Sequence, residues 1–522
     1  MVSTAAAPPA AFSHREVLRI LSGVLLCMLI AALDQTVLAT ALPAIAADFN
    51  GVPHLSWVIT AYLLLSTGAT LIFGKLSDLY GRRLLLEISI GIFLLASLAC
   101  AISNSMGSLI AARALQGVGG GGLYSMSQAS IADVVSARER GRYQAYITST
   151  FGIASIAGPL IGGFCVEYLS WRWAFWINLP IGVLAFSLCH RALARVTVRR
   201  QRRPIDFLGA ALIMPGVTAL MLVATLGGSE LPWVSPTILA LGAIGILFVA
   251  AFARRERDAP EALLPPRLFA SQVFRVATLL NFFINAITVG TFMLLPVFFQ
   301  LVIGVGAELS GAMLIVPLAT QIGASIYTGR RVQRTGRYAQ FPRAGFAALV
   351  FAGILFSTMT ATTPIWLIEI YMMVNAIGNG FCQSPLWVAV QNSAEMRDLG
   401  AVTGSTAFFR ALGGAFGAAI FWSVLLAVLA ATVAAEGHSG FGGDLLRGGH
   451  AALAALPADV RAFFIPAFTH AFSIAFQLSA AVAAAALATT FFLKEIPLRA
   501  STHTGQAAPP EERAPAKSAA AD

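Results

Sequence analysis

The sequence predicts an all-α polytopic membrane protein with about fourteen transmembrane helices. Of its 522 residues, 57% are hydrophobic and only 11% are charged, whereas about a quarter of the residues in a soluble globular domain are charged. The apolar residues occur in runs of about 18 or more, the length at which a helix crosses the hydrocarbon core of a bilayer. Such runs are too long and too uniformly apolar for barrel strands, so the spanning segments are predicted to be helices.

Fourteen apolar segments can be placed along the chain. Two groups of six flank a central pair, which predicts two six-helix bundles with two extra helices between them. In order, the predicted segments are 20–46, 54–74, 84–103, 107–131, 143–166, 173–193, 205–227, 236–253, 273–303, 307–328, 343–361, 364–391, 400–430 and 463–493.

The same segments divide the chain into regions. An N-terminal bundle is expected over 20–193, the two inserted helices and their linkers over 194–272, and a C-terminal bundle over 273–493. The C-terminal bundle includes one long outer loop, 431–462. The ends, 1–19 and 494–522, are rich in Ala, Pro and charge and are expected to be disordered cytoplasmic tails.

The distribution of positive charge sets the orientation. Cytoplasmic loops of membrane proteins carry an excess of Lys and Arg. If the N-terminus lies in the cytoplasm, 29 of the 34 Lys and Arg residues fall on the cytoplasmic side. Only Arg172, Arg447 and Arg461 fall outside, while Arg113 and Arg410 lie within spans. A multi-pass protein of the cytoplasmic (inner) cell membrane is therefore expected, with both termini in the cytoplasm.

Composition also excludes several classes of function. The net charge of +10 is explained by the cytoplasmic loops, so it does not indicate a nucleic-acid partner. The five cysteines lie in apolar runs without metal-ligand spacing, and we interpret them as small buried hydrophobic residues. The sequence has no Gly-x-x-x-x-Gly-Lys-Ser/Thr run for nucleotide binding. We therefore expect no metal, no cofactor and no use of ATP as the energy source.

Two charged residues within spans, Asp34 and Arg113, are predicted to lie at the same depth. A charge inside a span costs about 2.5 to 3.5 kcal/mol on insertion scales, so it needs a partner or a role. Asp34 lies about 21 Å above the inner end of its helix, and Arg113 about 9 Å below the outer end of its own, in a core about 30 Å thick. The pair can carry a transported proton, or it can be a static ion pair that joins two helices.

Two further charges within spans, Glu369 and Arg410, are candidates for the cavity. Glu369 lies near an outer boundary, where its carboxylate can instead reach the interface by snorkelling. Arg410 lies near the midplane beside glycines, where its guanidinium reaches neither interface easily. A cavity-facing role is therefore favoured for Arg410.

Glycine-rich stretches indicate close or moving helix contacts. The fourth segment contains Gly117 and a run over 119–122, and the fifth contains a Gly-Pro pair. Small residues let membrane helices approach closely, and Gly-Pro allows bending, so plain packing and a moving interface are both consistent with the spacing. The break 74–83 after the second segment shares its Gly and Arg spacing with the break 329–337 after the tenth, which indicates two related halves.

Four motifs occur in a fixed order along the first half of the chain. They are Leu33-Asp34-Gln35-Thr36-Val37 through Ala41-Leu42-Pro43, then Gly74 through Arg83, then Arg113-Ala114-Leu115-Gln116-Gly117-Val118-Gly119, and finally Gly158-Pro159-Leu160-Ile161-Gly162-Gly163. With these motifs the chain resembles the major facilitator superfamily, and within it the fourteen-helix drug:proton antiporters of the EmrB/QacA type. It departs from the family pattern at Ala39, Leu79 and Ala154.

The resemblance implies two bundles around a central cavity and transport by alternating access. It implies that Asp34 exchanges a proton and that Arg113 adjusts its affinity for protons. It also implies a conformational role for Gly74, Asp78, Gly81, Arg82, Arg83, Gly158, Pro159, Gly162 and Gly163. Aromatic and amide groups are expected to line the substrate cavity, and the candidates are Tyr62, Gln116, Asn285, Gln300, Asn375 and Gln383.

The expected function is proton-coupled export of small amphipathic or cationic compounds, that is, multidrug efflux. An exporter or importer of one specific metabolite is the alternative with the same fold. A membrane-embedded enzyme or sensor is the remote alternative, because the sequence has neither a catalytic constellation nor a sizeable soluble domain. Expected partners are the substrate, protons and the lipid bilayer, with a periplasmic adaptor protein if the source is a double-membrane bacterium.

The charge asymmetry generates a prediction about topology. In the variant Arg200→Cys, a membrane-impermeant maleimide should label the new thiol only from the cytoplasmic side, and in Gly440→Cys only from the outside. The reason is that positively charged loops are retained in the cytoplasm. Labelling would be compared in intact cells and inside-out vesicles. Labelling of position 200 in intact cells would show that the assigned orientation is incorrect.

Overall fold

The computed structural model describes residues 14–49, 55–135, 137–193, 206–228, 231–259, 262–305, 307–395, 398–435 and 458–498. These residues are helical almost throughout, and they include thirteen helices long and apolar enough to cross a membrane. The predicted all-α membrane class is confirmed. Most of the predicted tails and most of the 431–462 loop lie outside the described residues.

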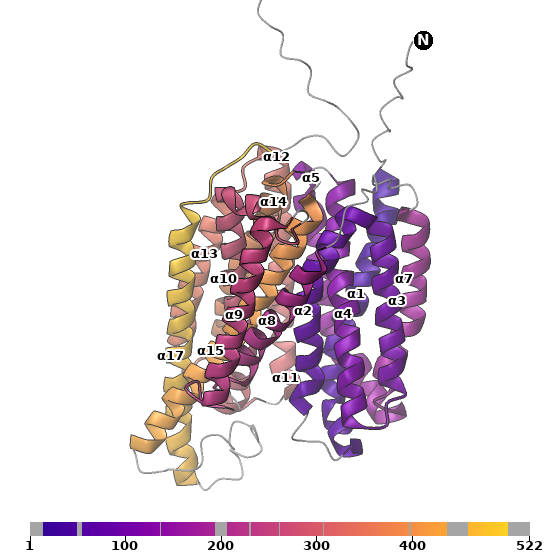
Figure 1. The fold of residues 1–522 in the computed structure, drawn as a ribbon. Coiled ribbons are helices and arrows are strands. Elements are labelled where there is room, and N and C mark those ends of the chain that lie inside the picture. The colour runs from indigo at the N-terminus through magenta and orange to yellow at the C-terminus, as the bar shows by residue number, and fades with distance from the viewer. Residues whose placement is uncertain are drawn as a thin grey trace, which may run out of the picture.

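Figure 1 shows the helices of the first half grouped together in indigo and purple on one side of the molecule. This half consists of α1 (His14–Phe49), α2 (Leu55–Tyr80), α3 (Arg82–Ala101), α4 (Met106–Val134), α5 (Ala137–Phe164), the π-helical turn η2 (Cys165–Leu169), α6 (Trp173–Trp176) and α7 (Asn178–Ala192).

The second half stands beside the first, in pink through yellow (Figure 1). Its helices are η4 (Pro266–Ala270), α10 (Gln272–Phe298), η5 (Phe299–Ile303), α11 (Ala307–Ala312), α12 (Ile315–Thr335), α13 (Gln340–Ser357), α14 (Ile365–Asn392), α15 (Leu399–Ala435) and α17 (Ala458–Thr490). The halves meet along α2 and α15, along α5 with α12 and α14, and where α4 reaches α15.

The two inserted helices, α8 (Phe207–Leu226) and α9 (Pro236–Asp258), lie over the seam between the halves. α8 packs on α2 of the first half and on α15 of the second. One hydrophobic cluster joins Leu71 of α2, Val217 of α8 and Phe408 of α15. The inserted pair therefore contacts both halves at once.

The fourth predicted span is α4, which is less apolar than the thirteen spanning helices. Its 29 residues are long enough to cross the bilayer, and most of them are buried. Glycines explain this placement, because a Cβ at Gly119 would lie 2.6 Å from the Phe93 backbone nitrogen of α3. A Cβ at Gly117 would overlap the backbone of Tyr62 in α2. α4 thus packs between protein neighbours and does not need an apolar surface toward lipid.

Two predicted spans are interrupted near their outer ends. The segment 173–193 is divided into α6 and α7 at Ile177, and the segment 307–328 into α11 and α12 at residues 313–314. A proline follows each break, Pro180 and Pro317. Because proline lacks an N–H, the carbonyl one turn before it has no helical partner, and the helix is interrupted there.

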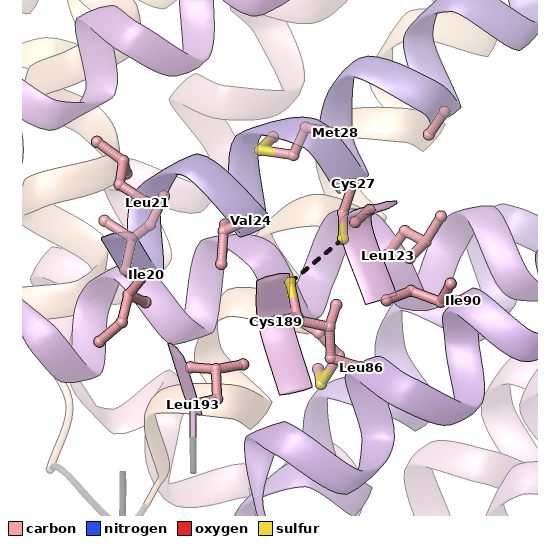
Figure 2. Packing of buried hydrophobic residues seen from close by; sticks show 14 of the residues in the cluster. Ile20, Leu21, Val24, Cys27, Met28, Leu86, Ile90, Leu123, Cys189 and Leu193 are labelled. Atoms are coloured by element: carbon pink, nitrogen blue, oxygen red, sulfur yellow. Dashed lines mark hydrogen bonds between the residues drawn. The ribbon is translucent and has the colours of Figure 1, made fainter. Parts of the chain in front are cut away.

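The core of the first half is built from α1, α2, α3, α4, α5 and α7, and Figure 2 shows the part of it around Cys27 and Cys189. Val24, Leu86 and Leu123 meet there with Cys27 and Cys189, whose sulfur atoms lie 3.7 Å apart. All five cysteines are free and buried, which confirms their interpretation as small hydrophobic residues.

The outer end of α1 is fixed by a polar contact. Asp48 accepts hydrogen bonds from Trp171 Nε1 and from Arg172 Nη1, each at 3.0 Å. These two donors hold the pKa of the Asp48 carboxyl below its usual value. Arg172 also donates to the Ser103 carbonyl after α3, so this cluster ties α1, α3 and α6 together.

The first residues of the predicted C-terminal tail are ordered, contrary to expectation. Glu495 accepts a hydrogen bond from the Tyr338 backbone nitrogen at 2.7 Å, and the Tyr338 hydroxyl donates to the Lys494 carbonyl at 3.0 Å. Burial raises the pKa of Tyr338. The chain is held here because Tyr338 offers buried polar groups between α12 and α13 that need partners.

The glycine packing of α4 can be tested with two substitutions in the same helix. Gly119→Ala should destabilise the protein by about 1 to 3 kcal/mol, because the new methyl group meets the α3 backbone. Gly107→Ala is the matched control, since its Cβ would meet nothing within 4 Å. The thermal unfolding temperatures of the two purified variants would be compared. Equal unfolding temperatures would contradict the packing argument.

Candidate functional site

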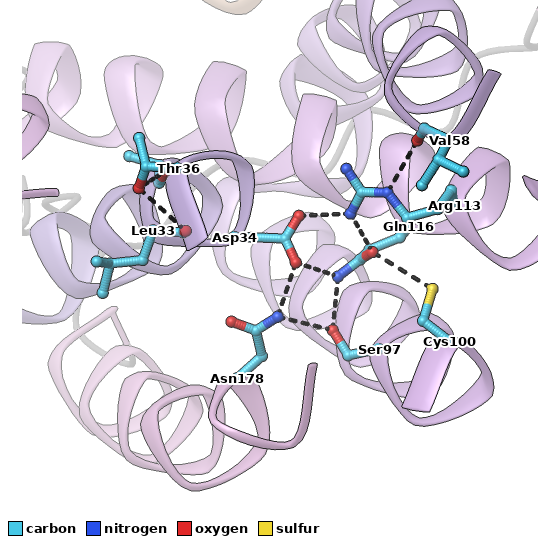
Figure 3. A network of polar contacts seen from close by, with 10 residues as sticks. Leu33, Asp34, Thr36, Val58, Ser97, Cys100, Arg113, Gln116 and Asn178 are labelled. Carbon is cyan, nitrogen blue, oxygen red and sulfur yellow. Dashed lines mark hydrogen bonds and ion pairs between the residues drawn. The ribbon is translucent and has the colours of Figure 1, made fainter. Parts of the chain in front are cut away.

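A buried polar network surrounds Asp34 in the middle of α1 (Figure 3). Asp34 Oδ2 accepts from Arg113 Nη1 at 2.6 Å, and Oδ1 accepts from Gln116 Nε2 and Asn178 Nδ2, each at 2.8 Å. Asp34 is 2% exposed and Arg113 is 1% exposed. The charged pair is therefore removed from solvent, and polar groups from α4 and α7 meet both carboxylate oxygens.

The guanidinium of Arg113 is held on its remaining sides. Its Nε donates to the Val58 carbonyl at 3.2 Å, and its Nη1 also donates to Gln116 Oε1 at 2.6 Å. The Tyr62 ring lies under it, with 4.5 Å between the guanidinium carbon and the ring centroid. This cation–π contact links the ion pair to α2.

The network agrees with the predicted depth of Asp34 and Arg113, because the two side chains meet directly. Tyr62 and Gln116, which we expected to line the substrate cavity, are buried members of this network instead. Sequence reasoning gave no role to Asn178 or Ser97. Ser97 accepts from Gln116 at 2.7 Å, and the sequence marks Asn178 by its place two residues before Pro180, in the stretch 171–182 that resembles the same family.

A second polar group lies where the halves meet, around Arg410 of α15. Arg410 Nη1 donates to the Tyr124 hydroxyl of α4 at 3.2 Å, and Arg410 Nε donates to Asn285 Oδ1 of α10 at 3.3 Å. Asn285 Nδ2 in turn donates to the Arg410 carbonyl at 2.7 Å. Arg410 and Asn285 are thus brought together as predicted cavity residues, and Tyr124 is a partner that the sequence did not identify.

The other predicted cavity residues are dispersed. On α14, Asn375 Oδ1 accepts from Asn379 at 3.1 Å, and Gln383 Oε1 accepts from Thr148 of α5 at 3.5 Å. Gln300 lies in η5, at the end of α10 away from Asn285. Glu369 lies in the first turns of α14, and one of its carboxylate oxygens is buried without a hydrogen-bond partner.

The third group joins the halves at the end that the charge distribution assigns to the cytoplasm. Asp78, near the end of α2, accepts hydrogen bonds from the backbone nitrogens of Gly400 at 2.9 Å and Ala401 at 2.8 Å. These nitrogens belong to the first turn of α15, where the helix dipole favours a negative charge. The carboxylate of one half thus caps a helix of the other.

Arg82 completes this contact, which we term the inner latch and define as Asp78, Arg82, Asp133 and the first turn of α15. Arg82 Nη2 lies 2.6 Å from Asp78 Oδ1, and its Nε lies 2.9 Å from Asp133 Oδ2 of α4. All three side chains are buried. Gly74 allows the close approach, because a Cβ there would lie 2.6 Å from the Gly400 carbonyl.

Two other residues of the 74–83 motif, Arg83 and Gly81, lie outside the inner latch. Arg83 does not join the inner latch, since it pairs with Glu87 at 2.8 Å and contacts His190. Gly81 joins α2 to α3 with φ of 96°, a conformation that favours glycine.

The glycines of α5 mostly serve packing on α1. A Cβ at Gly162 would lie 2.7 Å from the Val37 carbonyl, and one at Gly158 would overlap Thr36. Pro159 lies inside the helix, whereas a Cβ at Gly163 would meet nothing within 4 Å. Gly158 and Gly162 therefore permit close contact between α1 and α5, and Gly163 has no such function in this structure.

A cavity of about 680 Å³ lies between the ends of α5 and α7. Its walls include Leu160, Phe164, Trp173 and Pro180, and they contain no ionisable group except the Cys165 thiol. This cavity lacks the groups that would recognise a charged compound. No group of three or more His, Cys, Asp or Glu residues in the described part of the chain could hold a metal ion.

Comparison with known proteins identifies the family. The model of the Major Facilitator Superfamily matches residues 24–418. The chain belongs to this superfamily. It is a multi-pass membrane transporter rather than an enzyme, and its substrates are small molecules.

Individual proteins of this kind are also similar to the chain. An uncharacterised major-facilitator-type transporter of Mycobacterium tuberculosis is 35% identical over 90% of this chain and 68% of its own length. Multidrug transporter protein MdtP of Bacillus subtilis is 35% identical over 78% of this chain and 75% of its own length. Among solved structures, the proton:xylose symporter XylE has a TM-score of 0.60 at 13% identity, over 93% of this chain and 97% of that one, and supports the fold alone.

The inner latch generates a prediction with a control in the same motif. Arg82→Gln should reduce transport about tenfold or more while expression is maintained, because a lost bias of about 1.4 kcal/mol changes a conformational equilibrium tenfold. Asp78→Asn should act in the same direction. Arg83→Gln should leave transport near the wild-type level, since Arg83 lies outside the latch. Dye efflux and membrane protein content would be measured together. Normal efflux with Arg82→Gln would instead favour a plain turn with topology charges.

Proposed function

We propose that this transporter exports small amphipathic compounds in exchange for protons, and that Asp34 is the proton carrier. The observation that carries the proposal is a carboxylate in a buried pair with Arg113, 2.6 Å away, inside the membrane-spanning region. The direction of transport is supported by relatives named as a multidrug transporter, as multidrug resistance proteins and as efflux pumps, at 30 to 35% identity.

The network around Asp34 suits a carboxylate that takes up a proton and releases it again. A neighbouring guanidinium favours the charged carboxylate, whereas burial disfavours it. If the helices separate and the Asp34–Arg113 contact lengthens, the attraction weakens and the carboxylate takes up a proton. Because Arg113 stays charged throughout, it can return to displace that proton. Gln116 and Asn178 supply neutral hydrogen bonds that either protonation state can use.

Two helices can transmit this change to the inner latch. α4 carries Arg113 at one end and Asp133 of the latch at the other. α2 carries Tyr62 beneath the Arg113 guanidinium and, sixteen residues or about 24 Å further along, Asp78. Movement of Arg113 therefore acts on two of the three first-half residues of the latch, Asp133 and Asp78, through continuous helices.

The proton gradient can supply the required energy. At about 2.3 kcal/mol per charge per 100 mV, one proton crossing roughly 150 mV supplies about 3.5 kcal/mol. This is sufficient for a substrate gradient of about 300-fold. We propose an inner-membrane location with cytoplasmic termini, and a periplasmic adaptor protein as a partner if the source is a double-membrane bacterium.

Replacing the carboxylate tests the proposal. Asp34→Asn should leave the protein expressed and able to bind substrate, because the amide retains a hydrogen-bonding side chain of the same shape. Uphill efflux driven by an imposed pH gradient should be lost, because the side chain no longer takes up a proton. Counterflow, which needs no proton gradient, should persist in the same proteoliposomes. Glu167→Gln, at an exposed carboxylate of η2, is the control.

Two results would contradict this assignment. If Asp34→Asn fails to fold, the pair is a static structural contact. If the variant still moves substrate uphill with the usual pH dependence, the proton carrier lies elsewhere, and Glu369 is the next residue to replace because its carboxylate has an unpartnered buried oxygen.

A further inference from the structure

We propose that Arg410 binds an anionic group of the transported compound, so that the preferred substrates are amphipathic aromatic anions or zwitterions rather than simple cations. The inference rests on the proposed export function and assigns the chemical class of its substrate. The site consists of Arg410, Tyr124, Asn285 and Phe151.

The position of Arg410 is that of a central binding site. It lies eleven residues, or about 16 Å, from the inner end of α15, which is near the middle of a core about 30 Å thick. Its side chain reaches from α15 of the second half to Tyr124 of the first. Transporters built from two related halves bind substrate at the interface between them, near the midplane.

The positive charge of Arg410 is not neutralised by the protein. Within the described residues no carboxylate lies within ion-pair distance of it, and its two hydrogen-bond partners, Tyr124 and Asn285, are neutral. The other arginine deep in a span, Arg113, is paired with Asp34. An uncompensated charge at this depth is costly. An anion arriving with the substrate would supply the missing partner.

Unused hydrogen-bond donors point to the same ligand. Arginine has five N–H donors, and the Nη2 group of Arg410 makes no hydrogen bond to the described residues. Gln128, one turn further along α4 on the Tyr124 face, has a buried amide nitrogen without a partner. Both groups are donors, and a carboxylate or sulfonate accepts hydrogen bonds without donating any.

Aromatic rings adjoin the charge. Tyr124 and Phe151 of α5 lie edge to face, with 6.1 Å between ring centroids, and Phe151 is 38% exposed. Such rings offer a surface for the apolar body of an aromatic compound. A simple cation has no comparable partner at Asp34, because both carboxylate oxygens there are already hydrogen-bonded within the protein.

Arg410 could instead serve only to join α10 to α15 through Asn285. That role concerns the protein alone, so its loss would impair all substrates equally. Anion recognition would impair only the charged member of a matched pair of compounds. The fluorescent anion 8-anilinonaphthalene-1-sulfonate and its uncharged parent N-phenyl-1-naphthylamine form such a pair, since they share the aromatic body and differ in the sulfonate.

The experiment measures uptake of both dyes into inside-out proteoliposomes with an acidic lumen, together with dye binding to the purified full-length protein. We expect the wild type to favour the sulfonate. Arg410→Gln should raise the KM for the sulfonate about 10- to 100-fold, the range for a lost charged hydrogen bond, and should leave the neutral dye almost unchanged. Arg410→Lys should be intermediate. Arg254→Gln, at an exposed position of α9, is the control.

The outcomes separate this inference from the proposed function. Equal uptake of the sulfonate by wild type and Arg410→Gln would overturn the anion site while export stands, and so would a wild type that moves only the neutral dye. If no dye moves uphill, the proposed export function is wrong, and the dye-binding measurement then tests the anion site by itself. Sulfonate binding about tenfold weaker in Arg410→Gln would then still support the anion site, and equal binding would overturn it.

Discussion

The close packing of α4 against α2 and α3 is the constraint on which the other contacts depend. Glycines at 117, 119 and 121 let the backbones of these helices approach directly, and Gly122 leaves room for the Ser89 side chain of α3. Because they are fixed together, the polar residues of α4 are held at set depths. Arg113 meets Asp34, Tyr124 meets Arg410 of the second half, and Asp133 meets Arg82 in the inner latch. One tightly held helix therefore positions a component of the Asp34 network, of the contacts around Arg410 and of the inner latch.

The charges in the spanning region are arranged so that most are neutralised across helix boundaries. Asp34 on α1 is paired with α4, and Asp133 on α4 is paired with Arg82 at the start of α3. Asp78 extends this pattern across the seam by capping α15. A change at one pair must be accommodated by helices that also carry the others. Arg410 and Glu369 depart from the pattern, since neither has an ion-pair partner among the described residues.

The sequence predicted the depth of these residues well and their surroundings poorly. Depth follows from the constant rise of a helix, so Asp34 and Arg113 could be placed at one level before any contact was known. Which side of a helix faces which neighbour depends on packing between segments distant in the chain. For this reason the sequence predicts Gln116 and Tyr62 as cavity residues and does not identify Asn178 or Tyr124 as their neighbours. The ordered residues 494–498 were missed because their partner, Tyr338, lies far away in the sequence.

The polarity of α4 also has a consequence for how the protein is made. A segment that contains an arginine, two glutamines and a series of glycines has little favourable free energy of transfer into lipid. Its release from the translocation machinery into the bilayer as an isolated helix is therefore not favoured. It becomes stable there once α2 and α3 provide a surface that its glycines fit. Insertion of this part of the chain is therefore cooperative, because the helices that are synthesised earlier provide the surroundings in which α4 is stable in the membrane.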